Sequence, residues 1–449
     1  MTAEELEATH QDYDNYIDEW LFHIRSYFGG RHYRQGNYLL QHPFESTANY
    51  NRRRQTSYYY NYCGPIVDIF VSHLFRKGAS RDYGTLTGDP LLRAFLGDAD
   101  MEGNALTHCM REAARLAGIY GRVSLVVDKP GYETVTMAEA EALDIRPYVT
   151  IVTPENLLDW SYARRPSGGS VLDMVKIREG RDTYRIWTEE DWELWGVEDG
   201  GRGARLLDAG VHGLDTVPIV NLFNKQSGMK MVGISDIADI ADINKNIYYL
   251  CSDAKEIIEN TAFPMLAVPY ERGEGVETRD VGPRSIIQFD PAEPNARPHW
   301  LEPPHSSLTE IREWVKQDIA EIFRIARMGG VKATEDFARP RSGVALELEH
   351  QQLYAALSEK ADNLEQAETR VVELWALWQG KTFDGKIDYP DDFSVKDLER
   401  DLDLALKARG AVAGSPTFDR EVQKKIVSAV LPKLDMETRE RINGEIGVE

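Results

Sequence analysis

The chain has 449 residues and a formal net charge of −22 at pH 7, with 42% hydrophobic and 28% charged residues. Its length favours two to four domains of roughly 150 residues each, and its hydrophobic content is sufficient for packed cores. The acidic balance argues against a protein that grips nucleic acid through a broad basic surface. The three cysteines, Cys63, Cys109 and Cys251, are too far apart to form a recognisable metal or disulfide motif. The acidic start of the chain is unlike a signal peptide, and no apolar run is long enough for a membrane span.

Apolar residues at helical spacing dominate the first 120 positions. They predict helices over 4–28 and 58–76, and one or two more within 90–118. The intervening segment 31–57 is polar, and we expect it to be irregular. It contains Arg52, Arg53 and Arg54, which could contact phosphate. The favoured interpretation is that they pair with some of the 74 acidic residues.

The period then changes to that of strands. Short β-branched runs predict strands over 122–128 and 147–154. A two-residue alternation from 170 to 222, interrupted by Gly-containing turns, predicts an antiparallel meander that ends in a strand over 215–223. A long helix is expected over 233–260. The Pro- and Gly-rich segment after it should hold three short extended pieces, near 265–268, 285–289 and 299–301.

The rest of the chain is organised around residues 307–378. Ser307 and Glu310 have capping-box spacing and open a helix that ends at Gly329-Gly330. A loop containing Pro340 follows, and from Ser342-Gly343 a much longer helix extends to Gly380. Its apolar seam is almost a heptad pattern, interrupted by His350 and Lys360. After it we expect a strand within 381–389 and short helices over 394–445, with a break at 410–416 and a cap at Ser394.

Asp236, Asp239 and Asp242 are spaced by three residues and could share a divalent ion if all lay on one helix. Acidic residues also favour the first turn of a helix because the helix dipole is positive there, and this second interpretation is preferred.

No nucleotide-binding or catalytic motif is present in the sequence. We find no P-loop, no dinucleotide-binding glycine pattern, no H-E-x-x-H and no G-x-S-x-G. The ten histidines are scattered, and the many carboxylates identify no acid/base pair without geometry. The chain is therefore expected not to be an enzyme and to use no cofactor.

The order and lengths of these segments resemble the portal proteins of tailed bacteriophages. The resemblance is carried by Asp215–Asn224 followed by Gly233-Ile-Ser-Asp236, by Leu308–Met328, and by the run Ser342-Gly-Val-Ala-Leu346. It implies an α+β subunit with an α/β wing, a two-helix stem, a small β clip, a long spine helix and a helical crown. The implied domains are a wing (1–232), a first stem helix (233–262), a clip (263–306), a second stem helix (307–328), a tunnel loop (329–342), a spine helix with a return to the wing (343–390) and a crown (391–449).

A portal-like chain would form a ring, usually of twelve copies, through which double-stranded DNA is packaged and ejected. The implied partners are other copies of the chain, double-stranded DNA, the terminase large subunit, the major capsid and scaffolding proteins, and a head-tail adaptor, with no membrane. The implied location is the portal vertex of the virion, after assembly in the host cytoplasm. The residues expected to face DNA are those of the tunnel loop: Val331, Lys332, Thr334, Glu335, Asp336, Phe337, Arg339 and Arg341.

Within this loop, Lys332, Arg339 and Arg341 are either transient phosphate contacts or partners of acidic residues in the same or a neighbouring subunit. Two other functions remain open. One is a metal-dependent hydrolase that uses Asp236, Asp239 and Asp242, and the other is a non-viral ring or adaptor protein built on the long helix.

Overall fold

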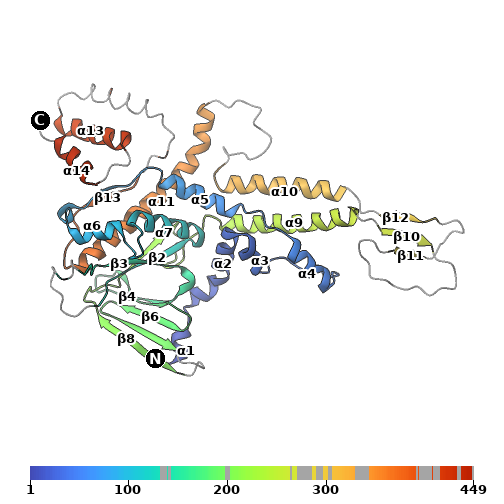
Figure 1. Cartoon of the computed structure of the whole chain (residues 1–449), viewed down its shortest axis with the longest axis horizontal. Helices are drawn as coiled ribbons and strands as arrows, with labels where there is room; N and C mark the ends of the chain where they lie inside the picture. The colour runs from blue at the N-terminus through green and yellow to red at the C-terminus, as the bar shows by residue number, and fades with distance from the viewer. Residues whose placement is uncertain are drawn as a thin grey trace.

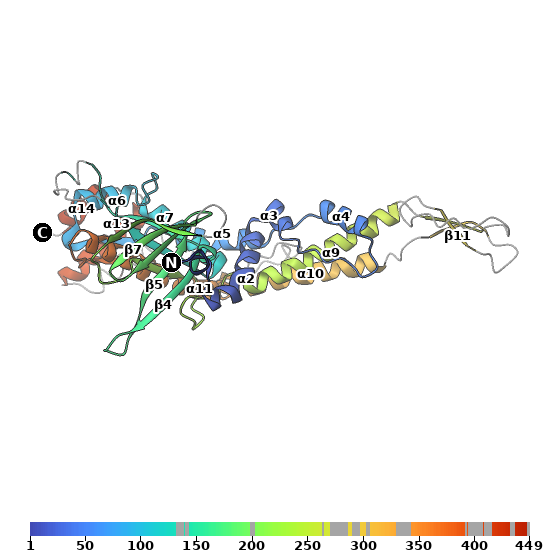
Figure 2. The same cartoon turned by 90° about the horizontal axis from the view of Figure 1, so that it is seen from below.

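A computed structural model describes most of the chain. The described residues are 1–131, 139, 143–197, 203–262, 265–269, 286–289, 297–301, 306–328, 343–390, 393, 407, 415–431 and 436–446. They mix helices and sheets, as expected for an α+β chain. The molecule is elongated, with a body at one end and a two-helix arm that projects from it (Figures 1 and 2).

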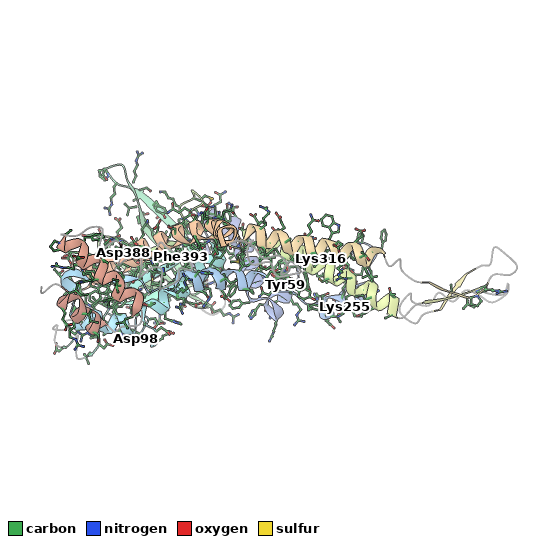
Figure 3. The ribbon with its side chains drawn as sticks, turned by 90° about the horizontal axis from the view of Figure 1, so that it is seen from above. Tyr59, Asp98, Lys255, Lys316, Asp388 and Phe393 are labelled. Atoms are coloured by element: carbon green, nitrogen blue, oxygen red, sulfur yellow. The ribbon has the colours of Figure 1, made fainter. Side chains whose placement is uncertain are left out.

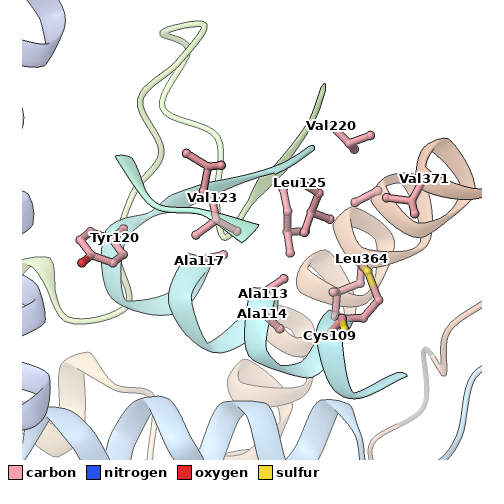
Figure 4. Close-up of a cluster of buried hydrophobic side chains, with 14 of the residues drawn as sticks. Cys109, Ala113, Ala114, Ala117, Tyr120, Val123, Leu125, Val220, Leu364 and Val371 are labelled. Carbon is pink, nitrogen blue, oxygen red and sulfur yellow. The ribbon is translucent and has the colours of Figure 1, made fainter. Parts of the chain in front are cut away.

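The body is built around a three-stranded antiparallel sheet in the order β3-β2-β9. Its strands are β2 (Arg122–Asp128), β3 (Tyr148–Val152) and β9 (Ile219–Phe223). Helix α7 (Leu106–Tyr120) and the long helix α11 (Gly343–Trp378) contact this sheet, and their side chains form one buried cluster with it (Figure 4). Small residues on α7, including Ala113 and Ala117, allow this close packing.

The three alternating runs predicted between 170 and 197 are confirmed as neighbouring strands of one five-stranded sheet in sequence order, β4 to β8, with every neighbouring pair antiparallel. The strand expected over 215–223 does not continue this sheet, because it is β9 and pairs with β2. Strand β4 (Leu157–Arg164) was not predicted, because it follows β3 after a single 3-10 turn, η2 (Pro154–Asn156). The hairpin of β4 and β5 extends well beyond the sheet (Figure 2). The remaining strands of this sheet are β5 (Ser170–Arg178), β6 (Thr183–Thr188), β7 (Asp191–Val197) and β8 (Ala204–Val211).

The helix predicted over 4–28 is divided in two. The backbone leaves the helical region at Ala8, and the His10 side chain caps the second helix by accepting a hydrogen bond from the Asp12 amide. The prediction around 58–76 is confirmed with shorter bounds, and the prediction within 90–118 is confirmed as two helices, the second of which ends at Tyr120. The N-terminal helices are α1 (Ala3–Glu7), α2 (Gln11–Phe28), α5 (Cys63–Leu74) and α6 (Pro90–Gly97), with a 3-10 turn η1 (Gly84–Leu86).

The prediction that 31–57 is irregular is wrong. Two helices lie there, α3 (Gly30–Gln35) and α4 (Thr47–Thr56). Ser46 caps α4 by accepting a hydrogen bond from the Asn49 amide. Helix α4 carries almost no apolar side chains, so its stability depends on polar contacts with the arm rather than on an apolar face.

The arm consists of two antiparallel helices, α9 (Ala238–Ala262) and α10 (Ser306–Ile325), with three short strands beyond their far ends (Figure 1). The three extended pieces expected in this segment are confirmed as β10 (Met265–Pro269), β11 (Ile286–Phe289) and β12 (His299–Leu301). They form one sheet in the order β11-β10-β12, with β10 and β11 parallel. Figure 3 shows Lys255 on α9 and Lys316 on α10, on the two rods of the arm.

The long helix predicted from Gly343 is confirmed as α11, and the seam residues Leu353, Leu357, Leu364 and Val371 are buried. Strand β13 (Lys386–Asp388), within the predicted 381–389, pairs with β1 (Ser80–Asp82). Two helices of the expected tail are described, α13 (Pro416–Val430) and α14 (Met436–Glu445). Ser394 lies outside the described residues. None of the described helices combines the length and hydropathy that a membrane crossing requires.

The free energy of unfolding should decrease as the pH falls, because of His23 on α2. Its side chain is 2% exposed, and burial lowers its pKa to about 4. The unfolded imidazole takes up a proton near pH 6.5, so the unfolded state binds more protons between these values. We therefore expect up to about 3 kcal/mol of stability to be lost as the pH falls from 6.5 to 4, at ~1.4 kcal/mol per pH unit. Urea unfolding of the wild-type protein and of His23→Gln, each at pH 7 and pH 4.5, measures the loss of stability in the two proteins. Equal losses in both proteins would contradict the assignment.

Candidate functional site: the arm and its base

The predicted tunnel-loop residues lie outside the described residues, as does all of 329–342. The structure does describe the two helices on either side of this segment. Helix α10 returns along the arm to the body, where Ala326 and Met328 are buried, and α11 begins at Gly343. The loop therefore joins the body end of the arm to the start of the longest helix. The candidate functional site is this junction together with the arm that extends from it.

The start of the arm is fixed by close contact between two backbone segments. Gly121 follows α7 with a φ of +88°, and a Cβ there would lie 2.3 Å from the carbonyl oxygen of Gly233. A Cβ on Gly233 would lie 2.0 Å from the carbonyl oxygen of Gly121. Only glycine fits at either position. Next to them, the Ser235 hydroxyl donates to the Ile119 carbonyl at 2.6 Å, and the Asp236 amide donates to the Gly118 carbonyl at 2.9 Å.

A buried ion pair ties this junction to α11. Lys360 Nζ lies 2.6 Å and 2.9 Å from the two carboxylate oxygens of Asp236, and both side chains are about one-tenth exposed. Lys360 also donates to the side-chain oxygen of Asn224, whose amide nitrogen donates to Asp236 at 2.9 Å. Three segments therefore meet in one satisfied polar cluster: the end of β9, the start of α9 and the middle of α11. Burying these charges is tolerable because each is paired and hydrogen-bonded.

This cluster alters the interpretation of the acidic triplet. Asp236 precedes α9, which begins at Ala238 rather than at 233, so the three aspartates do not share one helical face. Asp236 is committed to Lys360, whereas Asp239 and Asp242 are exposed. Across the part of the chain that is described, no three His, Cys, Asp or Glu side chains are arranged to hold a metal ion.

Helix α9 has two different faces. Ile243, Ile247 and Cys251 join the same apolar cluster as Val315, Ile319 and Ile322 of α10. The opposite side contacts α3, α4 and the residues between them, partly through Tyr248, which is buried against Tyr33 and Leu39, and partly through polar side chains. There, Arg53 is 3% exposed and donates to Glu45 at 2.9 Å and to Asp253 at 3.1 Å. Arg52 pairs with Glu256 and Glu259, so pairing with carboxylates, the favoured interpretation of the arginine run, is confirmed for two of its three members.

A second buried charge holds α11 in the body. Glu368 is fully buried and accepts two hydrogen bonds from Arg81 on β1, at 2.5 Å and 3.0 Å. The Tyr389 hydroxyl donates to the same carboxylate at 2.5 Å. Burial raises the pKa of Tyr389, and the charge of Glu368 adds to this effect. Burial would lower the pKa of Arg81, but its bonds to Glu368 outweigh that effect and raise it. Arg81 and Glu368 therefore form a bidentate pair, a geometry in which charge-assisted hydrogen bonds are strong.

The body also contains an open cavity of about 550 Å³ between α2, α5 and α7. Among its polar groups, Tyr27 donates to Asp68 at 2.8 Å, and Arg115 pairs with both Asp68 and Glu112. The residues that line the cavity are Tyr27, Asp68, Val71, Ser72, Arg111 and Arg115.

Lys360 was identified from the sequence only as an interruption of an apolar seam, and Glu368 was missed. A charged residue at a seam position was the available signal for Lys360, whereas Glu368 lies next to the seam residue Ala367 and gave no such signal. Their partners are 124 and 287 positions away, so no local pattern identified them.

No family model matches the chain, and no curated protein matches it. Comparison with solved structures gives matches of low sequence identity. A chain of the "Virion of native gene transfer agent (GTA) particle" is 14% identical, with a TM-score of 0.43, and the match covers 85% of this chain and 88% of that one. A chain of the "Neck of empty GTA particle computed with C6 symmetry" is 12% identical, with a TM-score of 0.44 and coverage of 80% and 89%. A chain of the "Neck of native GTA particle computed with C12 symmetry" is 13% identical, with a TM-score of 0.40 and coverage of 85% and 88%.

Proposed function

We propose that the chain is the subunit of a portal-like ring that forms a channel for double-stranded DNA at one vertex of a virus-like particle. The observation that carries this proposal is the order of parts along the arm. A helix leaves the body, three short strands follow, a second helix returns, and the segment 329–342 leads into a helix of 36 residues (Figure 1). Repeated around an axis, such arms would form the wall of a channel.

The proposal keeps the domain boundaries that the resemblance to portal proteins implies. Residues 1–232 form the wing, 263–306 the clip and 391–449 the crown. The segment 329–342 is the tunnel loop that borders the narrowest part of the channel. The acidic balance of the chain suits a conduit, because a predominantly acidic wall repels the phosphate backbone instead of holding it.

The role is structural, and we propose no catalytic activity. The buried charges at the arm base are paired with each other and serve to join segments. The energy for DNA movement would come from a separate terminase, whose large subunit would contact the clip end. The major capsid and scaffolding proteins and a head-tail adaptor would be the other partners.

Assembly provides the first test. With a subunit of 51.0 kDa, a ring of twelve has a mass of about 600 kDa. Light scattering coupled to size-exclusion chromatography should give a species near this value, and images down its axis should show a central hole. A protein that stays monomeric or dimeric at high concentration, and also in the presence of capsid components, would contradict the proposal.

The tunnel-loop residues provide a separate test. Lys332→Ala and Arg341→Ala each remove a cation that could contact passing phosphates. We expect rings of normal mass but a change in the length of packaged DNA or in the yield of infectious or DNA-transferring particles. Thr334→Ala, which alters no charge, is the control. If packaged length and yield are unchanged in both charge variants, these two residues are not phosphate contacts, and the ring itself is unaffected by that outcome.

A further inference from the structure

One segment of this acidic chain is strongly basic. Residues 30–57, here called the basic flank, contain five arginines and a single acidic residue, Glu45, so their formal charge is +4 (five positive, one negative) in a chain of −22. The basic flank comprises α3, α4 and the loop between them, and it lies along α9. Figures 1 and 2 both place α9 between this flank and α10.

Two of the five arginines hold the flank in place, and three do not. Arg52 and Arg53 are the ones paired with acidic residues of α9 and with Glu45. Arg31, Arg34 and Arg54 form no ion pair with any described carboxylate, and Arg31 and Arg34 are exposed. Arg54 donates only to the Asn37 side chain and lies over the Tyr50 ring. The surplus positive charge therefore faces outward.

Large apolar side chains are exposed beside these guanidinium groups. Phe44 is 102% exposed and Leu40 is 68% exposed, both in the loop between α3 and α4. An exposed apolar group among arginines is typical of a surface that another protein covers, since arginine and aromatic residues are enriched in such contacts. A phosphate backbone would contact the arginines but would leave these apolar groups in water.

The opposite flank of the arm offers the complementary chemistry. Glu310, Glu313, Trp314 and Gln317 lie on successive turns of α10, exposed and turned away from the apolar residues that contact α9. We call these four residues the outer α10 face. Trp314 is 55% exposed, and Glu310 has no cationic partner among the described residues. Glu313 pairs with Lys316 of the same helix in an exposed ion pair, so the Glu310 carboxylate and the Trp314 indole are the available partners for arginine.

We propose that the basic flank of one subunit binds the outer α10 face of the next copy. This inference rests on the proposed ring and identifies its subunit contact. A cyclic assembly built head to tail requires two different, complementary patches on opposite sides of the subunit. The arm provides them: guanidinium groups with Leu40 and Phe44 on one side, and glutamates with Trp314 on the other.

The test is the mass of the assembly in variants of the full chain. The triple variant Arg31→Glu, Arg34→Glu, Arg54→Glu and the single variant Trp314→Ala change side chains that are exposed or only partly buried, so circular dichroism should show an unchanged fold. Both are expected to shift the species near 600 kDa to the 51.0 kDa subunit at the same concentration. Arg165→Glu, on the β4–β5 hairpin and paired with Glu189, is the matched control and should leave the ring intact. Adding Glu310→Arg and Glu313→Arg to the triple variant should restore the ring.

Each outcome separates the two proposals. If wild type forms rings and the triple variant and Trp314→Ala also form them, the subunit contact proposed here is wrong while the ring stands. If wild type forms no ring, both proposals fail. If the triple variant keeps its ring but loses affinity for double-stranded DNA, the basic flank is a nucleic-acid contact and the proposed subunit contact is overturned.

Discussion

Lys360→Met is expected to lower the free energy of unfolding by about 3–5 kcal/mol. The substitution keeps an unbranched side chain, one atom shorter, but removes the only cation that contacts Asp236 among the described residues. The Asp236 carboxylate, which is 11% exposed, is then left without its charge partner. The cost is mainly that of an unpaired buried charge, not of a lost attraction. Urea unfolding of the purified protein, followed by tryptophan fluorescence, measures the change.

Two further variants define the cause of this effect. Lys316→Met removes an exposed lysine of α10 that pairs with Glu313, and it should cost at most about 1 kcal/mol. The double variant Lys360→Met, Asp236→Asn removes both charges and should recover most of the loss. If the double variant is as unstable as Lys360→Met alone, the ion pair is not the reason for the destabilisation.

Glu368→Gln should be destabilising by a similar amount, about 3–5 kcal/mol, because it leaves the Arg81 guanidinium without its counterion in a largely buried place. Glu373→Gln on the same helix is the matched control. Glu373 pairs with Arg370, but both side chains are about 40% exposed, and this variant should change stability by less than about 1 kcal/mol. Thermal unfolding of both variants and of the wild-type protein gives the midpoint temperature of each. Equal shifts of the midpoint in the two variants would contradict the assigned role of Glu368.

The helices of the arm and spine could be predicted from sequence because their signals are local. A seam from Leu353 to Val371 identifies α11, and glycines mark the positions where chain direction changes. The strands beyond the arm were also predictable, since each is a short apolar run between Pro- and Gly-rich segments. These patterns depend on neighbours within a few residues, which is the range over which period and capping carry information.

What could not be predicted depends on contacts between distant segments. Helix α4 has the sequence of a polar loop and is held by Arg52 and Arg53 binding α9, about 200 residues further along the chain. Asp236 was grouped with Asp239 and Asp242 by spacing, but it pairs with Lys360 instead. The Gly121–Gly233 contact has no sequence signature beyond two isolated glycines. The candidate DNA-facing residues from Val331 to Arg341 remain a prediction.

The position of Lys360 and Asp236 has a mechanical consequence. Helix α9 has 25 residues, so its far end lies about 37 Å from its first turn at ~1.5 Å per residue. A pivot of only 5° at the base would displace that end by about 3 Å. A small change in the positions of Lys360 and Asp236 would therefore produce a larger displacement at the far end of α9. In the proposed ring, the same displacement in every subunit would change the width of the channel at the far ends of the arms without unfolding any helix.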